Sequence, residues 1–215
     1  MKRITVCMLL VLATAALKAQ FISDVQSSRP FYQLPQGVQG NPFTNSNWST
    51  GVIKTIRGVE HRDLRIKYDV YSRQLVFQAD ENMYQFTEPV KEFTLDAGPG
   101  GKQATFLKSS LVHNLLPGEF VQVLAAGKVN FYKHYRKIEV ETAQYNAVSA
   151  KNLEDKNSFF VIRENTLTAV TFSKKQLETV LQDKWSQVAA FMDQNNHSAK
   201  NEAGWSAAIA FYNTL

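Results

Sequence analysis

A run of alternating residue types between Leu64 and Tyr71 limits the folds open to this chain more than any other feature. Leu64, Ile66, Tyr68 and Val70 occupy every second position, and the residues between them are Arg65, Lys67, Asp69 and Tyr71. Successive side chains of a strand point to opposite faces of the sheet. This period of two therefore predicts a strand with one face in the core and the other toward solvent.

Similar short apolar segments recur every eight to twelve residues, with polar turns between them. The segments expected to be strands are 52–57, 75–79, 83–87, 90–95, 104–108, 120–125, 129–140, 159–163 and 167–172. Such short connections join antiparallel strands, because parallel strands need long crossovers. We predict about eight to ten strands within residues 51–172, judged by the turn-bounded segments, and a turn or loop at 151–157.

The period changes after residue 172. Ser173 and Gln176 match a capping box, in which side chains satisfy the first free amides of a helix. Apolar residues then recur at helical spacing, and they are Leu177, Leu181, Trp185, Val188 and Met192. We predict one helix over about 174–195 and a second over about 202–213, capped by Asn201.

Strands followed by helices predict an α+β fold, a mainly antiparallel β meander with two C-terminal helices packed on it. Residues 51–215 are expected to form a single domain, preceded by an irregular tail at 20–50 whose large apolar groups lie partly along the domain surface. The pattern leaves open whether the sheet is a sandwich, a curled half-barrel or an open meander.

Residues 1–19 have the three parts of a secretory signal peptide. Met1, Lys2 and Arg3 form a basic start, residues 4–17 carry no charge, and Ala19 is a small residue at the expected cut. The uncharged run is shorter than the ~18 residues that span a bilayer. We therefore expect cleavage after Ala19, or after Ala15 or Ala16, and export to the periplasm or the cell exterior.

Export would change the chemistry that the chain can use. Cys7 is the only cysteine and would leave with the signal, so the mature protein could hold no disulfide, thiolate metal site or cysteine nucleophile. Loss of Lys2, Arg3 and Lys18 would lower the net charge from +5 to +2. A nearly neutral chain gives no electrostatic reason to expect nucleic-acid binding. No second apolar run reaches membrane length, which leaves only peripheral membrane association open.

No catalytic motif stands out, and we expect neither a catalytic residue, a metal site nor a cofactor. The four histidines, His61, His113, His134 and His197, lack the spacing that aims two imidazoles at one metal. The segment 98–102 lacks the first glycine and the Ser or Thr of a phosphate-binding loop. Carboxylate pairs such as those at 63/69 and 139/141 are common on solvated sheets and predict no glycosidase by themselves.

The strongest concentration of recognition-type side chains lies within 128–137. Tyr132, His134 and Arg136 would share one strand face, whereas Tyr135 lies on the other and could join them only at a bulge or sheet edge. Tyrosine and arginine are enriched where binding energy concentrates, so these four are the candidate binding residues. The alternative is an edge strand whose cations oppose aggregation.

Several segments resemble a group of uncharacterised secreted β-rich proteins common in Bacteroidota. The matching segments are 64–71 with Leu75, 90–93, 172–177 and 211–215. The resemblance implies an exported protein of a Gram-negative envelope, and it implies no activity and no functional residue.

Three functions follow from export and strand richness. The first is a non-enzymatic envelope protein that binds another protein or an envelope component. The second is a periplasmic carrier of lipid or another hydrophobic ligand, which would need an apolar cavity. The third is a carboxylate-dependent hydrolase of envelope glycans, which would need two converging carboxylates in a polar cleft.

Overall fold

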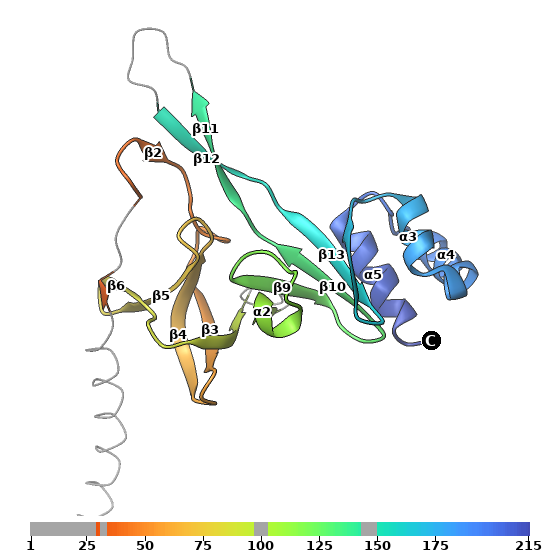
Figure 1. Cartoon of the computed structure of the whole chain (residues 1–215), viewed down its shortest axis with the longest axis horizontal. Coiled ribbons are helices and arrows are strands. Elements are labelled where there is room, and N and C mark those ends of the chain that lie inside the picture. Colours follow the sequence, from red (N-terminus) through yellow and green to blue (C-terminus); the bar gives the residue numbers. More distant parts are fainter. Residues whose placement is uncertain (1–28, 31–33, 97–102, 143–149) are drawn as a thin grey trace, which may run out of the picture.

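The computed structural model describes residues 29–30, 34–96, 103–142 and 150–215. The predicted signal segment with its cleavage site, and the glycine-rich segment 98–102, lie outside the described residues. Within them the fold is α+β as predicted, with mainly antiparallel strands followed by helices at the C-terminus (Figure 1).

The described residues form strands and helices in the following order. The strands are β1 (Arg29–Pro30), β2 (Val38–Gln39), β3 (Ser49–Thr55), β4 (Glu60–Asp69), β5 (Gln74–Ala79), β6 (Asn82–Gln85), β7 (Val90–Leu95), β8 (Ala104–Lys108), β9 (Phe120–Ala125), β10 (Val129–His134), β11 (Lys137–Thr142), β12 (Ala150–Asp155), β13 (Ser158–Arg163) and β14 (Thr166–Val170). The helices are α2 (Ser109–Val112), α3 (Lys174–Val180), the 3-10 turn η1 (Gln182–Lys184), α4 (Trp185–Gln194) and α5 (Glu202–Tyr212).

One large sheet runs through the molecule. Its order is β1-β6-β5-β4-β3-β7-β8-β9-β10-β13-β14, and all of these neighbours pair antiparallel. The two ends, β1 and β14, do not pair with each other, so the sheet is open. A second sheet has the order β11-β12-β2, in which β2 runs parallel to β12.

The prediction of a turn or loop at 151–157 is wrong, because residues 150–155 form β12. β12 pairs with β11 over six residue pairs, from Lys137–Asp155 to Thr142–Ala150. Ion pairs stabilise this ladder, with 2.9 Å between Lys137 Nζ and Asp155 Oδ1 and 2.7 Å between Lys151 Nζ and Glu139 Oε2. This hairpin is stabilised by cross-strand pairs of opposite charge, and β12 has no apolar face. The apolar alternation used to predict the other strands is therefore absent from β12.

The segment 129–140, expected to be one strand, is divided between the two sheets. β10 ends at His134 and β11 begins at Lys137, and the strands opposite them, β12 and β13, are interrupted at 156–157. At the break the Arg136 N–H donates to Asn157 Oδ1, and the Lys156 N–H donates to the Arg136 carbonyl. Counted from β3 to β14, the described residues between 49 and 170 form twelve strands, more than the eight to ten expected. The β11–β12 hairpin extends beyond the body of the molecule (Figure 1).

Part of the N-terminal tail lies on the domain. β2 extends the small sheet, and Phe43 forms a β-bridge with Asp69. The ammonium of Lys67 lies 4.9 Å from the ring centroid of Phe43 and 4.8 Å from that of Trp48. Cation–π contacts of this kind attach the tail to the outer side of β4.

The N-terminal half of the large sheet has an aromatic core. The rings of Phe93 and Phe106 stack with centroids 4.6 Å apart, and Phe120 meets Phe93 edge-on at 5.0 Å. Tyr68 packs against all three rings at 5.5–6.1 Å. These strands supply a buried cluster without help from a helix.

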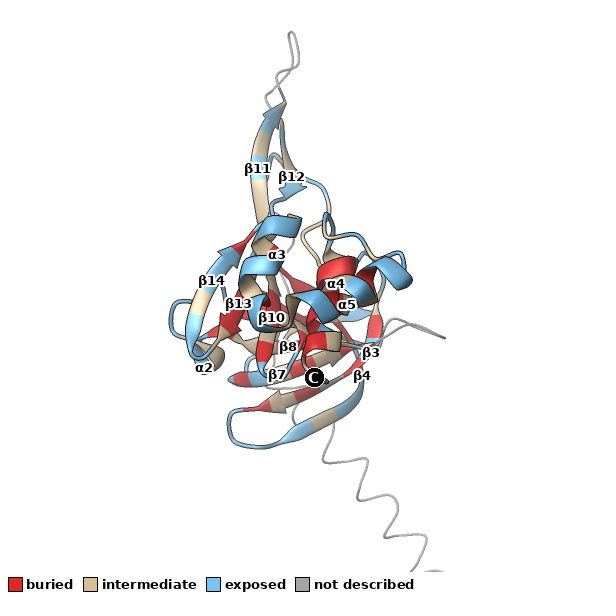
Figure 2. Cartoon of the chain, turned by 90° about the vertical axis from the view of Figure 1, so that its right-hand side faces the viewer, coloured by how far each residue is buried: buried red, intermediate tan, exposed pale blue. Residues whose placement is uncertain are grey.

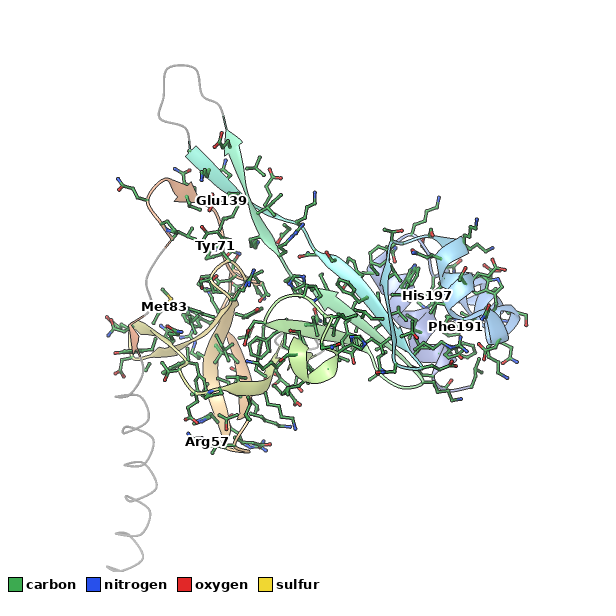
Figure 3. The ribbon with its side chains drawn as sticks, viewed as in Figure 1. Arg57, Tyr71, Met83, Glu139, Phe191 and His197 are labelled. Carbon is green, nitrogen blue, oxygen red and sulfur yellow. The ribbon has the colours of Figure 1, made fainter. Side chains whose placement is uncertain are left out.

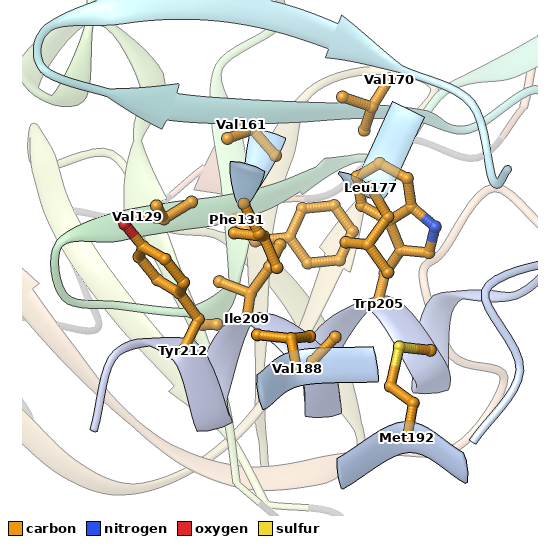
Figure 4. Packing of buried hydrophobic residues seen from close by; sticks show 13 residues of the cluster. Val129, Phe131, Val161, Val170, Leu177, Val188, Met192, Trp205, Ile209 and Tyr212 are labelled. Carbon is orange, nitrogen blue, oxygen red and sulfur yellow. The ribbon is translucent and has the colours of Figure 1, made fainter. Parts of the chain in front are cut away.

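The C-terminal half of the sheet is covered by the helices (Figure 4). Phe131 of β10 meets Trp205 of α5, which is fully buried, with ring centroids 5.9 Å apart. Leu177, Leu181 and Val188 of the preceding helical segment are also fully buried in this cluster. The predicted apolar stripes of the C-terminal segment therefore do face the sheet.

The predicted helix at 174–195 is divided into α3, η1 and α4. Leu181 departs from helical geometry, with φ −112° and ψ 22°, where the 3-10 turn begins. Ser173 caps α3 as predicted, since its Oγ accepts from the Gln176 N–H. Gln176 instead accepts from the Thr171 N–H, so the reciprocal half of the capping box joins α3 to the end of β14. Asn201 caps α5 through the Gly204 N–H, also as predicted.

Candidate functional site

The four residues singled out by the sequence do not form one surface. Tyr132 is 6 % exposed and packs in a cluster with Leu116, Val121 and Ile162. Burial raises the pKa of its hydroxyl, which favours the neutral form. Tyr132 is thus a core residue on the face of β10 opposite the helices and presents little surface to a ligand.

Tyr135 lies on the other side of the strand. Its hydroxyl donates to Gln122 Oε1 at 2.7 Å, and its ring packs 5.9 Å from Phe106. The ammonium of Lys133 lies 4.5 Å from the Tyr135 ring centroid and pairs with Glu202 of α5 at 2.8 Å. These contacts tie the two halves of the core together, which is a structural role.

His134 and Arg136 are the two members that stay on an accessible surface. His134 is half-buried at the end of β10, and Arg136 is exposed in the break before β11. Strand alternation predicted their common side, but nothing in the local sequence indicated that the strand would end between them.

A different site lies at the free end of the large sheet, where β14 has a neighbour on one side only. β13 and β14 form a hairpin with Glu164 and Asn165 in the turn, at φ 50° and 61°. Positive φ at both central residues is the type I′ turn that suits the twist of paired strands. The sequence signal for this turn was present as Glu164-Asn165 between two apolar runs.

The turn fixes which backbone groups of β14 point outward. In a two-residue hairpin the flanking residues, here Arg163 and Thr166, exchange both backbone hydrogen bonds. The pattern alternates along the ladder, so Thr168 also bonds to β13. The N–H and C=O groups of Leu167 and Ala169 point away from β13, toward the free edge.

A hollow of about 310 Å³ lies beside this edge. It is lined by Val161, Arg163, Glu164, Thr166, Thr168, Thr179, Val180 and Gln182. The strand residues come from β13, its turn and β14, and the others come from α3 and the start of η1. The free edge and the hollow are together called the β14 groove. Both β14 and α3 present largely exposed residues here (Figure 2).

Arg163 is a charged residue of the β14 groove whose position is set by contacts with the end of α3 and with η1. Its Nη1 donates to the Val180 carbonyl at 2.7 Å and lies 3.2 Å from Asp183 Oδ1. Its guanidinium also lies 5.7 Å from the ring centroid of Tyr212 in α5. The carbonyl contact satisfies one of the last backbone acceptors of α3, so Arg163 joins the floor of the groove to its helical wall.

Asp183 and Tyr212 both contact the guanidinium group of Arg163. Partial desolvation acts to raise the pKa of Asp183, but hydrogen bonds from Tyr212, its own backbone and Arg163 outweigh it and lower that pKa. Desolvation and the hydrogen bond to Asp183 raise the pKa of the Tyr212 hydroxyl. The carboxylate is therefore ionised and engaged near neutral pH, and it is not poised as a general acid.

The described part of the chain contains no group of three or more His, Cys, Asp or Glu residues arranged to hold a metal ion. None of its helices has the length and apolarity needed to cross a membrane. The groups that the β14 groove offers are backbone donors and acceptors, threonine hydroxyls and one paired arginine.

Comparisons of this chain with models of protein families, with curated proteins and with solved structures find no match.

Proposed function

We propose that this chain is an exported, non-enzymatic envelope protein that binds another polypeptide by adding an extended segment of it to β14. In such strand addition the main chain of the ligand continues the sheet, and pockets for alternate side chains give specificity. Export rests on the N-terminal sequence pattern alone, and the binding mode rests on the β14 groove.

The observation that carries the proposal is the contrast between β14 and the other strand edges of the described residues. β14 reads Thr-Leu-Thr-Ala-Val, with no charge and no proline, and its register is free of bulges. The edge strand β11 carries Lys137, Glu139 and Glu141, and β1 consists of Arg29 and Pro30. The remaining edge strand, β2, is only two residues long, and very short edge strands are another form of protection. Natural proteins protect exposed edges with charges, prolines or bulges. An edge without such protection favours pairing with another strand.

The hollow gives the added strand a place for side chains. Thr166 and Thr168 stand on the same face of β14 as the hollow, and α3 provides the opposite wall through Thr179 and Val180. A volume of 310 Å³ lies at the small end of the range for ligand pockets. It suits one or two side chains of moderate size with polar groups that can bond to the threonines.

The two other functions lack a comparable observation. A carrier needs an apolar cavity, but the N-terminal core is filled by rings in contact, and the β14 groove is open and partly polar. A hydrolase needs two free carboxylates that converge. Asp183 is paired with Arg163, and the side chain of Glu164 is 83 % exposed in the turn.

The test is selection of binders from a library of random linear peptides, followed by affinity measurement with the full chain and its variants. Ala169→Pro removes an N–H that faces the free edge, so we expect binding to fall at least about tenfold, since it loses a main-chain hydrogen bond and the strand geometry. Ala169→Thr keeps the N–H and serves as the matched control.

A second variant keeps the experiment decisive if proline disturbs the hairpin. Thr168→Lys leaves the backbone intact and places a long charged side chain in the hollow, so it should also weaken the selected peptides. Circular dichroism and thermal melts establish that each variant is folded. Selected peptides that bind both variants as tightly as the unaltered protein would rule out the β14 groove as the binding site.

A further inference from the structure

Three basic side chains come from segments that lie near one another, where the turn between β4 and β5 contacts β11 just after the break between β10 and β11. They are Arg73 from the turn, His134 at the end of β10 and Arg136 in the break. The turn is held there by Tyr71, whose hydroxyl donates to Glu139 Oε1 of β11 at 2.6 Å (Figure 3). We call these three residues the basic crease.

His134 is positioned by the loop before β9. A Cβ atom on Gly118 would lie 2.3 Å from His134 Nε2, so the imidazole occupies the space that any larger residue would fill. Gly118 also has φ +78°, a conformation that other residues rarely adopt. Within the described residues, neither ring nitrogen of His134 has a hydrogen-bond partner, so the ring is held in place while its polar atoms stay uncommitted.

The positive charges of the basic crease are not neutralised by the acidic residues around it. Glu119 pairs with Lys108, Glu139 pairs with Lys151, and Asp155 pairs with Lys137. Asp69 turns into the β4–β5 turn, where its Oδ1 accepts from the Ser72 N–H. No ion pair found among the described residues includes Arg73, His134 or Arg136.

The three groups are close enough to affect one another. Burial lowers the pKa of His134, and the charges of Arg136 and then Arg73 lower it further. Burial first, and then the two guanidinium groups, therefore favour the neutral form of the imidazole. An anion placed among them would remove the repulsion and accept hydrogen bonds from all three side chains.

We propose that the basic crease binds the phosphate group of an anionic ligand. Guanidinium forks match the geometry of phosphate oxygens and bind them in a bidentate manner. A phosphate group offers at least three acceptor oxygens and up to two negative charges, enough for two arginines and one imidazole. A carboxylate carries only one negative charge, so it would balance only one of the two guanidinium groups.

This site is separate from the β14 groove. Its residues come from β10, the break after it and the β4–β5 turn, whereas the groove is built by β13, β14 and α3. The two proposals are therefore independent, and a negative result for one site does not contradict the other. A protein with both sites could bind a polypeptide and a phosphate-bearing component at the same time.

The test follows the ring protons of His134 by NMR in pH titrations of the full chain, with and without sodium phosphate at constant ionic strength. Bound phosphate stabilises the imidazolium, so we expect phosphate to raise the pKa of His134 and to leave the ring-proton chemical shifts of His197 unchanged. In the Arg73→Gln and Arg136→Gln variants, phosphate affinity should fall by about tenfold or more, as for the loss of a charge-assisted hydrogen bond. Arg65→Gln, which removes an exposed charge elsewhere, is the matched control.

A second arm separates the possible sources of the phosphate group. Vesicles of phosphatidylcholine with phosphatidic acid, whose phosphate is a monoester with three terminal oxygens, are compared with phosphatidylcholine alone to test a lipid headgroup. Binding of inorganic phosphate without vesicle binding supports a soluble ligand, and binding of both supports a lipid. If neither phosphate nor anionic vesicles change the His134 titration, or if Arg65→Gln weakens phosphate as much as the crease variants do, the proposal is wrong.

Discussion

The two halves of the large sheet bury their apolar faces in different ways. In the N-terminal half, strands from β3 to β9 supply a core of their own, with Tyr68, Phe93, Phe106 and Phe120 in mutual ring contact. In the C-terminal half, strands β9, β10, β13 and β14 depend on α3, α4 and α5 for cover. One half is closed by its own aromatic side chains and the other by a separate layer.

This difference explains where the candidate site lies. A helix laid on a sheet meets its edge strand at an angle and leaves a gap between the strand and the end of the helix. Here that gap is the β14 groove, whose helical wall is the C-terminal end of α3. The N-terminal half has no such helical wall, because its strands pack against one another.

The largest expected effects come from removing the central ring of each half. Phe93→Ala and Trp205→Ala each delete a side chain that is fully buried, so each should lower the free energy of unfolding by ~3–5 kcal/mol. Because one continuous sheet joins the halves, both variants should shift a single urea transition. The measurement compares circular dichroism with tryptophan fluorescence in a Phe93→Ala chain that also carries Trp48→Phe, so that Trp185 and Trp205 of the C-terminal half are the only tryptophans left.

The comparison would change if the halves unfolded separately. In that case the loss of Phe93 would shift part of the dichroism transition and leave the fluorescence transition of Trp185 and Trp205 where it was. Two separated transitions would mean that the contacts of Lys133 and Tyr135 between the cores do not couple them.

Leu181→Ala tests how strongly the C-terminal half depends on its helical cover. Leu181 is fully buried at the start of the 3-10 turn, and its truncation should cost ~2–5 kcal/mol in chemical denaturation. Leu215→Ala, at a position 36 % exposed, is the control and should stay within ~0.5 kcal/mol of the unaltered protein. Equal effects of the two changes would show that the helices contribute little to the stability of this half.

The smallest expected effects concern two aspartates whose pKa values are shifted in opposite directions. The lowered pKa of Asp183 means that its contribution to stability is fully present above its ordinary pKa of 3.8 and is lost as the pH falls through the folded-state pKa. The pKa of Asp69 is raised, chiefly by burial, so its ionised form destabilises the fold at higher pH, and this penalty is relieved as the pH falls.

Stability measured between pH 3 and pH 7 in Asp183→Asn and Asp69→Asn should show this contrast. Relative to the unaltered protein, Asp183→Asn should be less stable near neutral pH, and the difference should shrink on acidification. Asp69→Asn removes the free-energy penalty of ionising a buried carboxyl group, so this variant should gain stability near neutral pH relative to the unaltered protein. The gain should shrink on acidification. The same pH dependence in both variants would contradict the opposite environments described for the two carboxylates.

The strand pattern predicted the class of the fold because it depends on local geometry. Alternation at 64–71 places Leu64, Ile66 and Tyr68 in the core, and helical spacing after Ser173 places Leu177, Leu181 and Trp205 there. A residue's side in a strand or helix follows from its position alone. The sequence missed β12, because an exposed hairpin stabilised by cross-strand ion pairs has no apolar period to detect.

Of the candidate binding residues, Tyr132 and Tyr135 lie in different clusters, but alternation could not tell which face would be covered. Leu116, Val121 and Ile162 come from other parts of the chain and bury Tyr132. Arg73, which completes the basic crease, is likewise distant in sequence from His134, and so is Gly118, which packs against the imidazole. Their positions depend on how the β4–β5 turn and the loop before β9 pack against β10.

By itself the sequence determined the expected signal segment, the antiparallel class of the sheet, the helical C-terminus and the caps at Ser173 and Asn201, since each depends on residues within a few positions of one another. Only the tertiary structure decided the strand order, the break after His134 and the free edge at β14. Strand order depends on which distant segments exchange backbone hydrogen bonds, and every strand offers the same backbone groups. That is why the uncharged run Thr166–Val170 becomes a candidate binding edge only when the fold leaves it last in the sheet.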